Sequence, residues 1–156
     1  MKELKQKLTE KMKEYFGDDE RRIRHALRVT EYAERILEHE READRDVVIA
    51  AAILHDIGIH EAERKYGSTA GKYQEIEGPP IAKRIILGEG LPEDFVEEVC
   101  RIIAHHHTPG VVDTLEFKVV YDADLIVNME DGEVKKGKFL TEGGRNVAEL
   151  SEGAPK

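Results

Sequence analysis

The sequence contains no tryptophan, a single cysteine and only 6% aromatic residues among its 156 residues. A lone cysteine excludes an intramolecular disulfide, and the apolar neighbours of Cys100 indicate a small core residue rather than a catalytic thiol. No apolar run approaches the roughly 20 residues that span a bilayer, and the charged amphipathic start is unlike a signal peptide. We therefore expect a cytoplasmic protein with no membrane partner.

Positive charge is also scarce, because 24 Lys and Arg face 33 Asp and Glu for a net charge of −9. Binding to a nucleic-acid polymer depends on clustered Lys and Arg, so the acidic balance predicts no such partner. A bound dication and a few nearby arginines can reverse the local field, and we expect a small phosphorylated substrate to remain compatible with this composition. A homo-oligomer is also compatible with it.

Strand patterns are nearly missing, whereas apolar residues recur with the 3.6-residue period of a helix along most of the chain. This predicts an all-α fold in which residues 1–156 form a single domain, a helical bundle of six or seven helices. The segment 67–78, rich in Gly, Ser and Thr, is expected to be irregular, and the pair Pro79-Pro80 is expected to open a helix. The expected helices cover residues 2–16, 20–38, 44–54, 79–87, 91–103 and 115–128, with short candidates at 61–66 and after Thr141.

A histidine and an aspartate, His55 and Asp56, follow directly on the strongly apolar run 47–54. Burying two polar side chains costs several kcal/mol unless a partner satisfies them. A hydrogen-bonded core pair is one interpretation. A divalent metal is the other, because imidazole and carboxylate are both ligands for such ions. The two side chains converge only if the helix ends there, as Gly58 indicates.

Further polar residues lie among apolar neighbours on two other expected helices. His25 is either a histidine at the edge of the core or a ligand, and Asp124 stands in the apolar segment 117–127. A helical bundle can turn such residues inward to form a metal site between its helices. Asp122 lies two residues from Asp124 and points to another side, so we expect it to pair within the bundle, with a ligand role as the alternative.

The run His105-His106-His107 closes an expected helix. Histidines at a helix C-terminus are favoured by the helix dipole alone. Because consecutive residues spread around the axis, one or two of the three could also face the cavity of His55.

Three segments together resemble the HD-domain superfamily of metal-dependent phosphohydrolases, which is named after its His-Asp doublet. Residues 21–30 are similar to the segment around the family's first metal histidine, and residues 54–58 are similar to the doublet. Residues 123–129 are similar to the Ala-Asp-x-Leu-x-Asn segment of the (p)ppGpp hydrolase branch. The resemblance spans about residues 21–128 and leaves 129–156 as a C-terminal extension.

The resemblance implies that four residues bind one divalent ion, and they are His25, His55, Asp56 and Asp124. It also implies less certain additional ligands at His105 and His106. Two-metal members use an earlier histidine at the position where this chain carries Gln74, so one ion is favoured over two, with Glu75 or Glu77 as substitutes. The ion could be Mn²⁺, Fe²⁺, Co²⁺, Ni²⁺, Zn²⁺ or Mg²⁺.

The expected activity is metal-dependent hydrolysis of a phosphate ester, of a nucleotide or a similar small molecule, by activated water. Asp56 is the expected ligand and local base, with Glu75 or Glu77 as a separate base, and Arg22 is expected to contact the phosphoryl group. Ile59 departs from the pattern of the (p)ppGpp branch, which weakens an assignment to it. The alternatives are a diiron oxygenase on the same scaffold and a non-catalytic metal-binding or ligand-binding signalling module.

Overall fold

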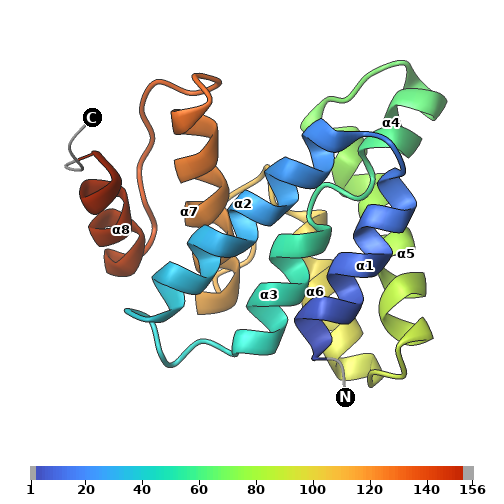
Figure 1. The fold of residues 1–156 in the computed structure, drawn as a ribbon, viewed down its shortest axis with the longest axis horizontal. Helices are drawn as coiled ribbons and strands as arrows, with labels where there is room; N and C mark the ends of the chain where they lie inside the picture. Colours follow the sequence, from blue (N-terminus) through green and yellow to red (C-terminus); the bar gives the residue numbers. More distant parts are fainter. Residues whose placement is uncertain (1–2, 153–156) are drawn as a thin grey trace.

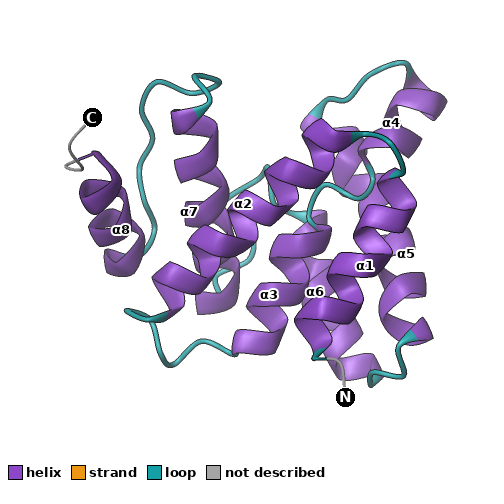
Figure 2. Cartoon of the chain, in the orientation of Figure 1, coloured by secondary structure: helices purple, strands orange, loops and turns teal. Residues whose placement is uncertain are grey.

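Eight helices and no strand make up the regular structure of residues 3–152, which are the residues that the computed structural model describes (Figure 2). The all-α prediction is confirmed. The helix number exceeds the expected six or seven because both short candidate segments are helical. None of the described helices is long and apolar enough to cross a membrane. The helices are α1 (Leu4–Phe16), α2 (Glu20–Leu37), α3 (Arg45–Leu54), α4 (Ile59–Tyr66), α5 (Gly71–Gly88), α6 (Glu93–Ala104), α7 (Leu115–Glu130) and α8 (Glu142–Glu152).

Helix α3 lies at the centre of the fold, where it packs against α1, α2, α6 and α7 (Figure 1). Its N-terminus is capped by Asp44, whose carboxylate accepts hydrogen bonds from the N–H groups of Asp46 and Val47. Every residue from Val47 to Leu54 is buried, as the apolar run predicts. The C-terminal end of α3 therefore delivers the His-Asp doublet into the interior.

The long helix α5 differs from the prediction because it begins at Gly71 and contains Pro79 and Pro80 in its interior. A proline inside a helix removes one N–H donor and crowds the preceding turn, which is why the sequence suggested a helix start. Tertiary packing outweighs that preference. A Cβ atom on Gly58 would lie 2.4 Å from the backbone nitrogen of Gly78, so the chain after the doublet crosses α5 in direct backbone contact.

Helix α8 packs against α2 and α7 on the side of the molecule away from α4 and α5 (Figure 1). The predicted cap of this helix is confirmed, since the Thr141 hydroxyl accepts a hydrogen bond of 2.8 Å from the N–H of Gly144. The segment that connects α7 to α8 returns along α7, which brings residues 131–134 to the rim of the cavity described below.

Candidate metal centre

The doublet occupies a tight turn between α3 and α4. Helix α3 ends at Leu54, whose carbonyl accepts a hydrogen bond of 3.1 Å from the N–H of Ile57, and the carbonyl of Asp56 accepts one of 3.0 Å from the N–H of Ile59. The side chain of His55 is buried and that of Asp56 nearly so. The helix therefore ends where the sequence predicts, and adjacent side chains can converge.

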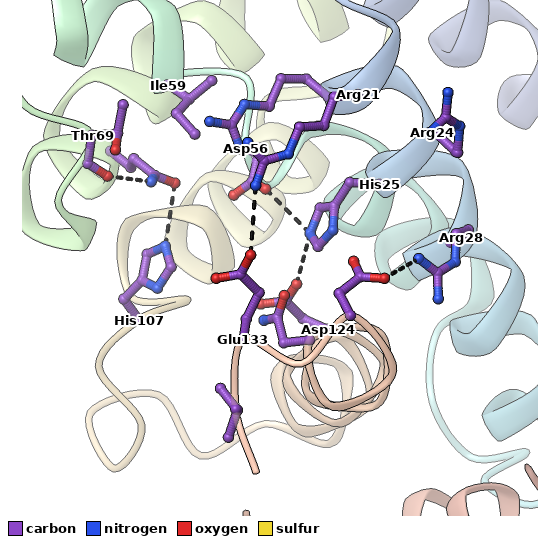
Figure 3. A pocket seen from close by; sticks show the side chains of 15 residues that line it. Arg21, Arg24, His25, Arg28, Asp56, Ile59, Thr69, His107, Asp124 and Glu133 are labelled. Atoms are coloured by element: carbon purple, nitrogen blue, oxygen red, sulfur yellow. Dashed lines mark hydrogen bonds and ion pairs between the residues drawn. The ribbon is translucent and has the colours of Figure 1, made fainter.

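Four predicted residues from three parts of the chain meet at this turn. His25 Nε2 lies 3.0 Å from Asp124 Oδ1 and 3.3 Å from Asp56 Oδ2 (Figure 3). His55 Nε2 lies 3.3 Å from the same Asp56 oxygen and 3.4 Å from the same Asp124 oxygen. Two imidazole nitrogens and two carboxylate oxygens thus face one small space between α2, α3 and α7.

A hydrogen bond of the His55 ring to a backbone carbonyl shows which ring nitrogen carries a proton. Its Nδ1 lies 2.7 Å from the carbonyl oxygen of Ala52, and because a carbonyl only accepts, Nδ1 carries the proton. In the neutral ring Nε2 then presents a lone pair toward two carboxylates. This buried nitrogen makes no hydrogen bond. A lone pair facing carboxylate oxygens is unfavourable unless a cation, either a proton on Nε2 or a metal ion, lies between them.

His106 repeats the arrangement on the other side of Asp56. Its Nδ1 donates to the carbonyl of Ile103 at 2.6 Å, and its buried Nε2, also without a hydrogen bond, lies 3.3 Å from Asp56 Oδ1. Asp56 therefore turns Oδ2 toward His25 and His55 and Oδ1 toward His106. His55 Nε2 and His106 Nε2 are the two buried side-chain atoms without a partner in the described part of the chain.

The predicted pair of additional histidines, His105 and His106, needs a correction, because the structure places His106 with His107 and turns His105 away. His105 ends α6 with a φ of −129°, outside the helical region, so helical spacing no longer applies after it. Its Nδ1 donates to the carbonyl of Arg101, and it lines a separate hollow beside Val111. The ligating atoms of Asp56, His106 and His107 all lie within 4.8 Å of one another.

Gln74 holds His107 in place. The Gln74 amide nitrogen donates to the carbonyl of Thr69 at 2.6 Å, so its oxygen faces His107 Nε2 at 3.2 Å and accepts a hydrogen bond (Figure 3). A Cβ atom on Gly71 would lie 2.7 Å from the His107 ring, so the ring packs directly on the start of α5. Because the oxygen of Gln74 accepts this hydrogen bond, Nε2 of His107 carries a proton. Nδ1 of His107 is then the ring nitrogen with an available lone pair.

The charges of the cluster reinforce one another. Burial opposes the charged form of His55, yet the carboxylates of Asp56 and Asp124 outweigh it and raise the pKa of His55 well above its usual value. Burial likewise opposes ionisation of both carboxyl groups, but the neighbouring histidines hold the pKa of Asp56 and that of Asp124 below their usual range. The two aspartates are therefore carboxylates that require a positive partner.

These residues fit a divalent metal ion. His25, His55 and Asp56 bring their ligating atoms within 4.8 Å of one another, and Asp124 lies against both histidines. Imidazole nitrogen and carboxylate oxygen are the ligand types of borderline first-row metals. The carbonyl hydrogen bond of His55 is also the outer contact that orients a metal-bound histidine. The buried nitrogen without a hydrogen bond is the observation that a bound ion explains.

An open cavity of about 880 Å³ lies over the cluster. Helix α2 provides four arginines and His25 to its wall, and Figure 3 shows Arg21, Arg24 and Arg28 around the opening. The predicted phosphoryl-contacting residue Arg22 is one of the four. The remaining lining residues are Asp56, Ile59, Thr69, Gln74, His107, Asp124, Asn128, Asp131, Glu133 and Val134.

The candidate bases Glu75 and Glu77 do not line this cavity. The carboxylate of Glu75 accepts hydrogen bonds from the N–H of His107 and the hydroxyl of Thr108, and so holds the turn after α6. Glu77 is buried, with its carboxylate bonded to Lys65 Nζ and to the Tyr66 hydroxyl, each at 2.9 Å. Their catalytic role remains a prediction.

Comparison with known proteins agrees with the geometry. The sequence model of the HD domain matches residues 22–129. Among curated proteins none matches the chain. A crystal structure of a predicted HD superfamily hydrolase from an uncultured Thermotogales bacterium has a TM-score of 0.71 and 30% sequence identity, over 92% of this chain and 82% of that one. The chain therefore belongs to the HD-domain family.

Proposed function

We propose that this protein is a divalent-metal-dependent phosphohydrolase that cleaves a phosphate ester of a small molecule. The observation that carries the proposal is the pair of carboxylates, Asp56 and Asp124, facing Nε2 of His55, a buried nitrogen without a hydrogen bond, at the base of an open cavity. Such a pair holds a cation where a substrate can reach it. The arginines above it supply the charge that a phosphate group needs.

The chain's own residues divide the work between holding and positioning. His25, His55, Asp56 and Asp124 would hold the ion, which supplies Lewis-acid polarisation of a phosphoryl oxygen and a lowered pKa for water. Arg22 lines the cavity one helical turn before His25, so its guanidinium can bind equatorial phosphate oxygens. Asp56 is the carboxylate of the cluster that would accept the proton of the attacking water molecule.

The test is a metal and substrate screen on tag-free protein. Metal-free protein is loaded in turn with Mn²⁺, Fe²⁺, Co²⁺, Ni²⁺, Zn²⁺ and Mg²⁺ and assayed for phosphate release from phosphomonoesters and phosphodiesters. We expect release that depends on the ion and disappears in His55→Ala. The control is His39→Ala, which removes an exposed imidazole in the turn after α2 and should leave release unchanged. No release with any ion, or full activity in His55→Ala, would refute the proposal.

A diiron oxygenase is the second candidate function, and the sharing of Asp56 between two histidine groups is the observation that favours it. It requires two irons and oxygen consumption with an organic substrate. Iron analysis and a mixed-valence signal in electron paramagnetic resonance distinguish it from the hydrolase. One ion per chain, with phosphate release and no such signal, excludes it.

A further inference from the structure

The cavity wall on α2 is a row of arginines that continues past the metal cluster in both directions. Arg21 lies three and four residues before Arg24 and His25, and these lie four and three residues before Arg28, so the four share one face of the helix. From Arg21 to Arg28 this face extends about 10 Å along the axis. The positive wall is therefore longer than a single phosphate group at the cluster would need.

Four carboxylates line the same cavity as the four arginines, and two of them, Asp56 and Asp124, belong to the metal cluster. Arg28 is held by two acids at the C-terminal end of α7, with 2.6 Å contacts to both Asp131 and Glu130. Arg21 pairs with Glu133 at 3.5 Å. The guanidinium group of Arg24 makes no ion pair or hydrogen bond within the described part of the chain. If Arg22 binds the phosphate that is cleaved, Arg24 is the arginine of this wall that is left without an ion-pair partner among the described residues.

The pair formed by Arg21 and Glu133 places a carboxylate of the chain against this part of the wall. Its side chains are 73% and 60% exposed, and exposed pairs of this kind contribute roughly 0–1 kcal/mol. A phosphate group carries more charge than a carboxylate and can displace Glu133. Because Arg21 and Arg24 are three residues apart on one face, both guanidinium groups could then bind the same phosphate.

The rest of the wall offers little surface to an apolar group. Ile59 and Val134 are its apolar members, and the only aromatic rings among its described residues are the imidazoles of His25 and His107. The cavity volume lies within the roughly 300–1,000 Å³ range of sites for drug-sized ligands. Room for a large ligand together with a polar wall favours a ligand recognised through several anionic groups.

We propose that the substrate carries a second phosphate, bound by Arg21 and Arg24 while the phosphate to be cleaved lies at the metal cluster. This inference rests on the proposed function and narrows its substrate class to bisphosphorylated small molecules or short phosphate chains. Glu133 occupies Arg21 in the free protein and is released when the second phosphate binds. Arg21 and Arg24 are binding residues at a distance from the reacting atoms.

Binding tests the inference independently of turnover. Calorimetric titration of the Mn²⁺-loaded protein with phosphate and with methylenediphosphonate should show tighter binding of the diphosphonate by about tenfold or more. Arg24→Gln should remove most of that difference, and Glu133→Gln should increase it a few-fold because Arg21 is freed. Arg35→Gln, on the same helix and outside the cavity, is the matched control and should change neither affinity.

Turnover then identifies which bisphosphate chemistry is used. Fructose 1,6-bisphosphate is compared with fructose 6-phosphate, and adenosine 3′,5′-bisphosphate is compared with AMP. ADP, also compared with AMP, represents a contiguous phosphate chain. We expect at least one member with two phosphates to be preferred in kcat/KM, and Arg24→Gln to reduce that preference about tenfold. Equal affinity for phosphate and diphosphonate, or equal effects of Arg24→Gln and Arg35→Gln, overturns the inference. If no ester is cleaved but the diphosphonate result holds, the hydrolase proposal fails and the anion site stands.

Discussion

Asp122 and Asp124 lie two residues apart on α7 and face different surroundings. Asp122 is fully buried, and its carboxylate accepts hydrogen bonds from the N–H groups of Leu140 and Thr141 and from the Thr141 hydroxyl. Asp124 faces the imidazoles of His25 and His55. Asp122 is surrounded by two backbone donors and a hydroxyl, whereas Asp124 meets two histidine rings.

The difference separates a structural acid from a functional one. Three donors satisfy Asp122 without any added group, although burial still raises the pKa of its carboxyl group and these hydrogen bonds only partly offset the rise. The carboxylate anchors the start of α8 against α7. A Cβ atom on Gly144 would lie 2.3 Å from its Oδ2, so the contact is close. Asp124 instead accepts a hydrogen bond of 3.0 Å from His25 and lies 3.4 Å from Nε2 of His55, which makes no hydrogen bond. The two acids are the same residue type on one helix, so it is the groups around each carboxylate that distinguish them.

The largest effect is expected at Asp124. Asp124→Asn keeps the shape and removes the charge, and we expect the affinity for the metal to fall by about 1,000-fold, because loss of even an outer contact costs roughly 10–100-fold. Phosphate hydrolysis should disappear with the metal. Metal content by mass spectrometry and a circular dichroism melt separate metal loss from unfolding. Retention of the ion would show that Asp124 is another structural acid.

Asp122→Ala should behave in the opposite way. It leaves two N–H groups and a hydroxyl without their acceptor, at roughly 1–3 kcal/mol each when they stay buried, so the free energy of unfolding should fall by about 3 kcal/mol. Metal stoichiometry should be unchanged. Thr141→Val removes only the hydroxyl and its cap, and a urea titration should give a loss of about 1 kcal/mol. Metal loss with unchanged stability in Asp122→Ala would reverse the roles of the two acids.

The neighbours His105 and His106 extend the comparison to histidines. His106→Ala removes a buried nitrogen that faces Asp56 Oδ1 and should weaken metal binding about tenfold, as loss of a supporting contact does. His105→Ala removes a ring that faces the separate hollow and should leave metal binding unchanged. Competition with a colorimetric chelator measures both variants. Equal losses in the two would mean that the helix end, rather than Asp56, determines the effect.

The smallest effect is a pH dependence of the metal-free protein. The pKa of His55 is raised, so its contribution to stability is complete below the ordinary histidine value of 6.5 and is lost as pH rises through the raised pKa. The pKa of Asp56 is lowered, so its contribution is present above 3.8 and is lost as pH falls. Thermal melts should therefore show maximal stability between these values. The metal should restore the stability that is lost as pH rises. A melting temperature that does not change with pH would contradict these pKa shifts.

Much of this site follows from the sequence because apolar neighbours make its polar residues conspicuous. His25, His55, Asp56 and Asp124 each interrupt an apolar face, and the structure brings all four together. The prediction of an all-α bundle succeeds for the same reason, since helical periodicity reports burial directly.

The remaining features depend on contacts that local sequence does not encode. The resemblance points to His105 and His106, whereas the backbone leaves the helix at His105 and the structure groups His106 with His107 and Asp56. The role of Asp122 depends on a segment 18 to 19 residues away. The start of α5 at Gly71 depends on its crossing with the chain at Gly58, which overrides the preference of two prolines.

Anomalous diffraction from crystals grown with Mn²⁺ tests the central claim most directly. The account predicts a metal peak bonded by Nε2 of His25 and of His55 and by the carboxylates of Asp56 and Asp124. The peak should vanish in Asp124→Asn crystals and remain in Thr141→Val crystals. Absence of a peak at these four side chains in fully loaded protein, with the ion bound elsewhere, would contradict the account.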